Sequence, residues 1–98
     1  MKKYYYNCPR GFSNEFSIIS VDQNSPAELA AFQKFEERYR DSGDPDWDLL
    51  RISYKRATEI IAQEKRTRKS YLAAGLNLSN NPVGATEIIT AKEFFEEW

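Results

Sequence analysis

The segment SPAELAAFQKFEERYR, residues 25–40, carries the densest set of helix signals in the chain. Ser25 is a favourable N-cap, Pro26 suits the first helical position, and Glu28 stands three residues after Ser25, where a capping box needs an acid. Apolar residues then recur at helical spacing, and most are aromatic: Leu29, Phe32, Phe35 and Tyr39. This pattern predicts a helix over residues 26–40 that buries one aromatic stripe and ends at the DSGDP sequence.

The chain before this helix predicts two β-strands. Residues 2–6 and 16–21 are rich in aromatic and β-branched residues, and the NCPRGFSNE sequence between them has the proline, glycine and asparagines of a turn. We therefore expect an antiparallel hairpin with a long loop. In the second strand, Ile18 falls on one face and Ile19 and Val21 on the other, which indicates a central strand.

A second helix is predicted to begin at Asp44 or Asp46, with Pro45 in its first turn. Beyond Ile61 the apolar spacing lapses, so either one long helix extends into water or the helix breaks near residues 67–70. Gly75 is the expected stop. The predicted buried stripe of this helix comprises Leu50, Tyr54, Ala57 and Ile61, with Leu49 and Ile60 beside it.

The sequence GATEIITAKEFFEEW, residues 84–98, fits two patterns. In the first, residues 87–90 form a strand that pairs with the hairpin, and Thr90 caps a helix with Glu93 as its capping-box partner. In the second, residues 86–98 form one continuous helix. The capping-box sequence favours the first pattern, although a short apolar run fits either.

Together these segments predict one α+β domain over residues 1–98. Its architecture is expected to be a small antiparallel sheet of about three strands packed against two or three helices, in the order ββααβα. A chain of 98 residues suits a single modest core. We expect that core to form from the hairpin, the first helix and the C-terminal aromatic residues.

The chemical groups of the chain argue against catalysis. Histidine is absent, so Ser–His and Cys–His nucleophile pairs cannot form. The single cysteine, Cys8, excludes an internal disulfide and a cysteine-based zinc site, and an ordinary half-buried loop thiol explains it better than a nucleophile does. The four glycines are too scattered for a phosphate loop. We therefore expect a protein that is not an enzyme and holds no cofactor.

The DPDWD sequence, residues 44–48, raises the question of calcium. Its three aspartates have the spacing of the first EF-hand ligands, but Leu49 stands where the loop needs glycine and Lys55 where it needs glutamate. These carboxylates are better explained as caps of a helix start. We expect no metal site here.

The sequence QEKRTRKSY, residues 63–71, places four cations within five residues. On a helix, three of them share one side and Arg66 lies apart, while Glu59 and Glu64 interleave with the cations. A solvated helix face, a docking patch for an acidic protein surface and a nucleic-acid grip all remain open. The partner-binding residues that we predict are Lys65, Arg66, Arg68, Lys69 and Tyr71.

A second candidate surface lies at the N-terminus and comprises Lys2, Lys3, Tyr5 and Arg10. Aromatic rings on a sheet can stack unpaired bases while nearby cations hold the phosphates. However, Tyr4 and Tyr6 would share one face and Tyr5 the other, so at least one ring is expected to belong to the core.

These observations favour a small protein-binding module whose partner presents an acidic surface. The net charge of −1 gives no broad basic excess, so a nucleic-acid-binding accessory protein is the alternative. Inhibitors and adaptors encoded by phages or other mobile elements, anti-CRISPR proteins among them, are analogous in size and composition. No secretion signal or membrane-spanning run is visible, and neither a membrane role nor a small-molecule substrate is indicated, so we expect a cytoplasmic protein.

Overall fold

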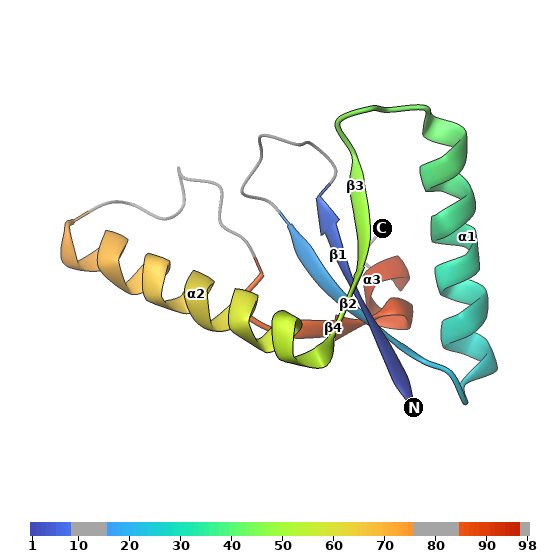
Figure 1. Ribbon diagram of the computed structural model, residues 1–98, viewed down its shortest axis with the longest axis horizontal. Coiled ribbons are helices and arrows are strands. Elements are labelled where there is room, and N and C mark those ends of the chain that lie inside the picture. Colours follow the sequence, from blue (N-terminus) through green and yellow to red (C-terminus); the bar gives the residue numbers. More distant parts are fainter. Residues whose placement is uncertain (9–15, 76–84, 97–98) are drawn as a thin grey trace.

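The computed structural model describes residues 1–8, 16–75 and 85–96 and shows an α+β fold (Figure 1). Its strands form one mixed sheet in the order β3-β1-β2-β4. The order of elements is ββαβαβα, with four strands rather than the predicted three. The elements are β1 (Lys2–Cys8), β2 (Ser17–Asp22), α1 (Pro26–Ser42), β3 (Asp48–Ile52), α2 (Tyr54–Ala73), β4 (Ile88–Thr90) and α3 (Ala91–Glu96).

The predicted hairpin is confirmed, and its second strand is central. β1 and β2 pair antiparallel, from Lys2 opposite Asp22 to Asn7 opposite Ser17. β2 lies between β1 and β4, and both Ile18 and Ile19 are fully buried although they face opposite sides of the sheet. Apolar residues on both faces of a strand therefore did indicate its central position.

Helices cover both faces of the sheet (Figure 1). α1 and α3 pack on one face, and α2 packs on the other, so the sheet separates two clusters of buried side chains. The α1/α3 cluster contains Ile19, Val21, Phe32, Phe35, Ala91 and Phe94. The smaller α2 cluster contains Ile18, Ala57 and Ile61.

The first helix begins where the sequence predicts, but only half of the capping box forms. The Glu28 N–H donates to Ser25 Oγ at 3.4 Å. The Ser25 N–H donates to the Asp22 carbonyl at 3.1 Å instead of to the Glu28 carboxylate. Ser25 therefore caps the helix through its side chain, and its backbone closes the turn that follows β2.

The prediction that the second helix begins at Asp44 or Asp46 is wrong, because residues 48–52 form strand β3. β3 pairs antiparallel with β1, with Ile52 opposite Tyr4 and Asp48 opposite Cys8. If residues 48–52 formed a helix, the N–H and carbonyl groups along one edge of β1 would lack partners. Pairing with β3 satisfies these groups of β1. Leu50 and Tyr54, which the helix would have buried, are exposed.

A partly buried hydrogen bond holds the chain at the entry to β3. The Trp47 indole N–H donates to Asn7 Oδ1 at 2.7 Å, which joins the residue before β3 to a buried position on β1. The ring of Trp47 also packs edge-on against Phe35 of α1 at 5.7 Å. These contacts fix where the chain from α1 enters the sheet.

α2 is one continuous helix, so the long-helix alternative is the correct one. Ser53 caps it by accepting the Arg56 N–H at 3.1 Å. Gly75, with φ of +79°, follows the last turn, and its N–H donates to the Leu72 carbonyl at 3.1 Å. The later turns of α2 extend beyond the strands (Figure 1). Within the described ranges, no helix has the length and apolar composition needed to span a bilayer.

The C-terminal segment is a strand followed by a helix, as the capping-box sequence indicated. β4 pairs in parallel with β2, with Ile88 opposite Ile18 and Thr90 opposite Ser20. The Glu93 N–H donates to Thr90 Oγ1 at 3.1 Å, so Thr90 caps α3. The parallel pairing of β4 is what makes the sheet mixed rather than antiparallel.

Candidate functional site

The predicted cations lie on the part of α2 that follows its contact with the sheet. Ala57 and Ile61 bury one side of the helix against Ile18 of β2. With about 100° between successive residues, that contact determines which later side chains face the sheet and which face away.

The structure divides the four cations into two groups. Lys65, Arg66 and Lys69 are exposed, whereas Arg68 is half-buried. Arg68 follows the buried Ile61 by seven residues, so both lie on the side of α2 that faces the sheet. There it lines a hollow with residues of β2 and β4. Arg68 thus differs from Lys65 and Lys69, with which helical spacing grouped it, because it is half-buried and lines a hollow while they are exposed.

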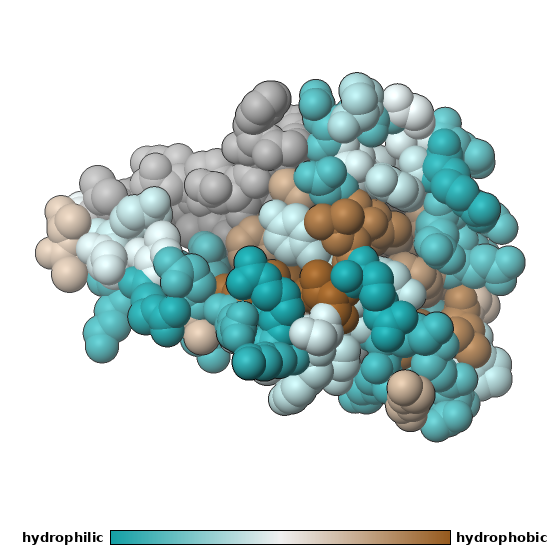
Figure 2. Space-filling view, in the orientation of Figure 1, coloured by the Kyte–Doolittle hydropathy of each residue, from teal (hydrophilic) through white to brown (hydrophobic). Residues whose placement is uncertain are grey.

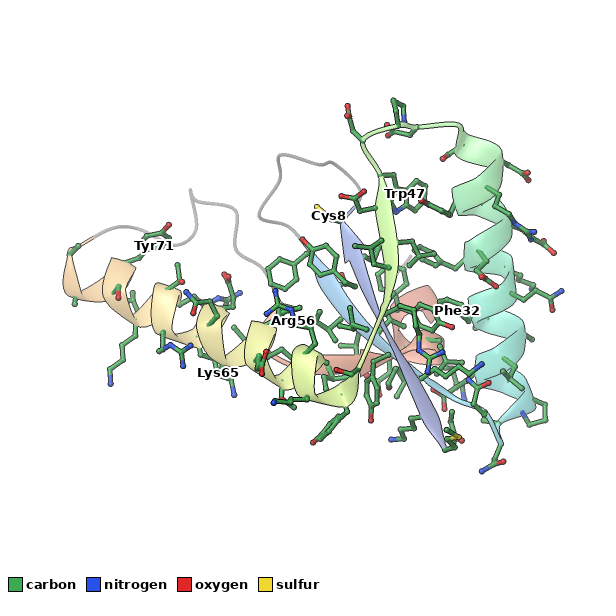
Figure 3. The ribbon with its side chains drawn as sticks, in the orientation of Figure 1. Cys8, Phe32, Trp47, Arg56, Lys65 and Tyr71 are labelled. Atoms are coloured by element: carbon green, nitrogen blue, oxygen red, sulfur yellow. The ribbon has the colours of Figure 1, made fainter. Side chains whose placement is uncertain are left out.

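Tyr71 does not join the exposed cations. It is half-buried, and Lys65 and Tyr71 project from different sides of α2 (Figure 3). Leu72, in contrast, is 61% exposed and follows Lys65 by seven residues and Lys69 by three. Leu72 lies on the side of α2 that carries Lys65, but it also follows Arg68 by four residues, so it is exposed because its turn lies beyond the strands and not because it faces away from the sheet. Four exposed side chains of this part of the helix, Lys65, Arg66, Lys69 and Leu72, are called the α2 outer face.

Within the part of the chain that the structure describes, the cations of this face form no ion pair along the helix. The Arg66 guanidinium donates to the Gln63 side-chain oxygen at 3.0 Å, and this oxygen is neutral. An acidic partner is present earlier in α2, where Arg56 lies 3.6 Å from Glu59. Residues 65–75 contain no aspartate or glutamate. The end of α2 therefore presents a net positive surface to water.

The second predicted surface is not assembled as expected. Lys2 is exposed, while Lys3 and Tyr5 are half-buried on the opposite face of β1. The Tyr5 ring packs against Phe32 at 4.3 Å between centroids. The Arg51 guanidinium lies 5.8 Å from the same ring. Arg10 lies outside the described residues.

The remaining N-terminal tyrosines also pack against aromatic rings. Tyr4 lies 5.2 Å from Tyr54, and Tyr6 lies 5.4 Å from Phe16, between ring centroids. Together with Tyr5, three successive tyrosines of β1 therefore each pack against another aromatic ring of the same chain. Rings committed in this way stabilise the fold, whereas base stacking needs an open ring face.

The sequence suggested that Cys8 is a half-buried loop residue. It is instead the last residue of β1. It is 2% exposed, so its thiol is sheltered from solvent and from any substrate in it. Cys8 shares a face of β1 with Tyr6 and lies opposite Asp48 of β3. Burial, reinforced by the negative charge of Cys8, by a hydrogen bond with Cys8 and by the charge of Asp48, raises the pKa of Tyr6 from 10.0 to about 12.

The raised pKa of Tyr6 predicts an alkaline loss of stability. The unfolded chain releases the Tyr6 proton near pH 10.0 and the folded chain near pH 12, so the stabilisation is complete below pH 10 and falls as the pH rises towards 12. We expect Tyr6→Phe to reduce this fall, measured as the free energy of unfolding in urea at several pH values. Tyr54→Phe, at an exposed tyrosine, is the control, and an equal effect of both variants would contradict the assignment to Tyr6.

The acidic residues after α1 have a structural explanation. Asp44 Oδ1 accepts the Asp46 N–H at 2.9 Å, which closes a turn before β3. Asp48 is the first residue of β3 and therefore does not continue a calcium loop. Among the described residues, no group of three or more acidic or sulfur side chains could hold a metal ion.

A groove that the sequence did not predict lies between α2 and the β3 side of the sheet. Its volume is about 370 Å³. Leu50, at its edge, is 54% exposed, and apolar atoms along β3 are visible between the hydrophilic surfaces of the helices (Figure 2). The groove is lined by Tyr6, Phe16, Leu50, Ile52, Arg56, Ile60, Gln63 and Glu64.

No protein-family model, curated protein or solved structure matches this chain.

Proposed function

We propose that this chain is a small non-catalytic protein-binding module, an inhibitor or adaptor that acts in the cytoplasm on a partner with an acidic surface. The observation that carries the proposal is the α2 outer face, where three exposed cations precede one exposed leucine on turns that extend beyond the sheet. Such cations speed encounter with an acidic surface, and an apolar side chain beside them supplies a contact that excludes water.

The rigidity of α2 supports this proposal. The helix is capped at both ends and its first turns are held to the sheet by Ala57 and Ile61, so a partner would meet the outer face on an already formed helix. A preorganised surface loses less conformational entropy on binding than a mobile one. Arg68 and Tyr71, included in the sequence-based prediction, would support the helix from its inner side.

Nucleic-acid binding is the alternative function and has weaker support. Three exposed cations could release about three counterions, which is a small electrostatic contribution to affinity. Sequence-tolerant binding of single strands also needs stacking rings beside the cations, and the rings of Tyr4, Tyr5 and Tyr6 each pack against another ring. The α2 outer face has no aromatic residue.

The test of this function compares two triple charge reversals. The first, Lys65→Glu, Arg66→Glu and Lys69→Glu, reverses the α2 outer face. The second changes the net charge equally but elsewhere, at three exposed cations of α1 and α3: Lys34→Glu, Arg40→Glu and Lys92→Glu. A partner is captured from the native host with the unaltered chain, and its association with all three proteins is then measured in purified form.

We expect the first variant to lower the association rate constant by about tenfold or more, and the second to change it little, because only nearby charges steer docking. Duplex DNA, single-stranded DNA and RNA are measured in parallel at physiological salt. Tight binding to any of them that falls steeply with salt and is abolished only by the first variant would replace this function by the alternative. Equal effects of both variants on the partner would also contradict it.

A further inference from the structure

The outer edge of β3 is an open sheet edge. β3 is the end strand of the sheet, and no strand among the described residues pairs with its outer side. Leu50, at the centre of β3, is more than half exposed, and apolar atoms along β3 reach the surface (Figure 2). The described strand contains no proline, lysine or bulge, and its two charged residues, Asp48 and Arg51, have opposite signs, so an antiparallel strand of matching charge can pair with it.

The backbone groups that face outward on β3 can be identified from the register. The Gln23 N–H donates to the Met1 carbonyl at 2.9 Å, so the backbone of Met1 points towards β2. The N–H and carbonyl groups of successive residues point to opposite sides of a strand, so the backbone groups of even-numbered β1 residues point towards β3. Their partners on β3 point back to β1: Asp48, Leu50 and Ile52. The N–H and carbonyl groups of Leu49 and Arg51 therefore point outward from the sheet.

Opposite charges flank the two ends of this edge. Asp44, Asp46 and Asp48 lie at the N-terminal end of β3, and all three are exposed. The C-terminal end carries three exposed cations: Arg51, Lys55 and Arg56. A partner that lies antiparallel to β3 and carries the same distribution would place acids beside cations at both ends.

We propose that the outer edge of β3 binds a second copy of this chain, in an antiparallel pairing whose two-fold axis passes beside Leu50. In a two-fold antiparallel pair, the acidic end of one β3 strand lies beside the basic end of the other. The second copy therefore complements the charge of this edge. The two sheets then join into one continuous sheet with four strands from each copy. This interface is separate from the α2 outer face and does not depend on the proposed function.

The register follows from the outward backbone groups. With the axis at Leu50, Leu49 of each copy stands opposite Arg51 of the other, and these outward groups exchange four hydrogen bonds. All five residues of β3 overlap in this register. An axis at Arg51 would place two guanidinium groups opposite each other, which is destabilising. An axis at Leu49 would shorten the overlap.

The side chains also fit this register. Leu50 faces Leu50 of the second copy at a position without backbone hydrogen bonds, where opposing side chains approach most closely. Asp48 shares the face of Leu50, and Arg56 lines the groove beside Leu50 and Ile52. Antiparallel pairing therefore brings Asp48 of one copy towards Arg56 of the other. Pairing thus covers an exposed leucine and adds a second carboxylate beside the Arg56–Glu59 ion pair.

The first test is sedimentation equilibrium of the full chain up to about 1 mM, a range that detects weak dimers. We expect a reversible equilibrium between the 11.4 kDa chain and a species of twice that mass. Leu50→Asp should weaken dimerisation at least about tenfold, because it places two like charges opposite each other. Leu29→Asp, at an exposed leucine of α1, should leave dimerisation unchanged. A wild-type chain that stays monomeric, or a dimer insensitive to Leu50→Asp, overturns the proposal.

The second test separates loss of the interface from loss of the fold. One variant carries Asp46→Lys and Asp48→Lys, and the other carries Lys55→Glu and Arg56→Glu. Each alone should be monomeric, because both ends of its β3 edge then carry the same charge. Mixing them should restore dimers that contain one copy of each, which requires both variants to be folded. Dimerisation of either variant alone, or failure of the mixture to associate, overturns the antiparallel register.

Discussion

Replacing Phe35 by alanine is expected to lower the free energy of unfolding by about 3–5 kcal/mol, the largest effect of any substitution considered for this protein. Phe35 is fully buried. Its ring contacts Phe32, Trp47 and Phe94, with centroid separations of 6.2, 5.7 and 5.2 Å. The side chain thus connects α1, the entry to β3 and α3. Urea unfolding followed by circular dichroism measures the effect.

The matched control is Leu29→Ala, which removes an exposed side chain from the same helix. Its expected effect is below about 1 kcal/mol, since little apolar surface returns to water. A similar loss for both variants would mean that helix propensity, rather than the aromatic cluster, determines the stability of α1. A loss below about 1.5 kcal/mol at Phe35 would contradict its central position in the core.

α1 and the hairpin could be predicted because their signals are local. Ser25 and Pro26 define a helix start within a few residues, and Phe32 and Phe35 recur at helical spacing on the side that the structure buries. Ile18 and Ile19 similarly report the environment of both faces of β2. In each case, the information that determines the structure lies inside the segment itself.

β3 could not be predicted in the same way, because its structure depends on a distant strand. Leu50, Tyr54, Ala57 and Ile61 happen to follow helical spacing across a boundary between two elements. The competing signal is pairing with β1, residues 2–8, which sequence periodicity does not report. Ser53 was the available local signal, since it is a good N-cap immediately before the helix that does form.

The candidate site was predicted in part. The four cations of residues 65–69 are evident in the sequence, but the side each one takes depends on which face of α2 packs against the sheet. The seven-residue spacing between Ile61 and Arg68 was available to show that Arg68 lies inward. The exposure of Leu72 could not be read from the sequence, because Leu72 follows Ile61 by eleven residues, which spacing alone would place inward, and is exposed only because α2 extends beyond the strands. The groove beside β3 required knowledge of β3 itself.

Ile61→Ala is expected to lower the free energy of unfolding by about 2–4 kcal/mol and to loosen α2 selectively. Ile61 is 8% exposed, and with Ala57 it forms the buried part of the contact between α2 and the sheet. The aromatic cluster lies on the other face of the sheet, so α1 keeps its contacts. Hydrogen exchange measured by mass spectrometry should show earlier exchange in peptides of α2 than in those of α1.

The control for this substitution is Leu72→Ala on the same helix, at a side chain that is mostly exposed. It should leave hydrogen exchange in the first turns of α2 unchanged, because those turns are held by Ala57 and Ile61.

If the α2 outer face binds its partner as a rigid surface, Ile61→Ala should also weaken binding, although Ile61 faces the sheet. The reason is that ordering a loosened helix then costs free energy on association. Uniform acceleration of exchange across α1 and α2 would instead mean that the two faces of the sheet unfold as one unit, and binding would then weaken only in proportion to the unfolded fraction.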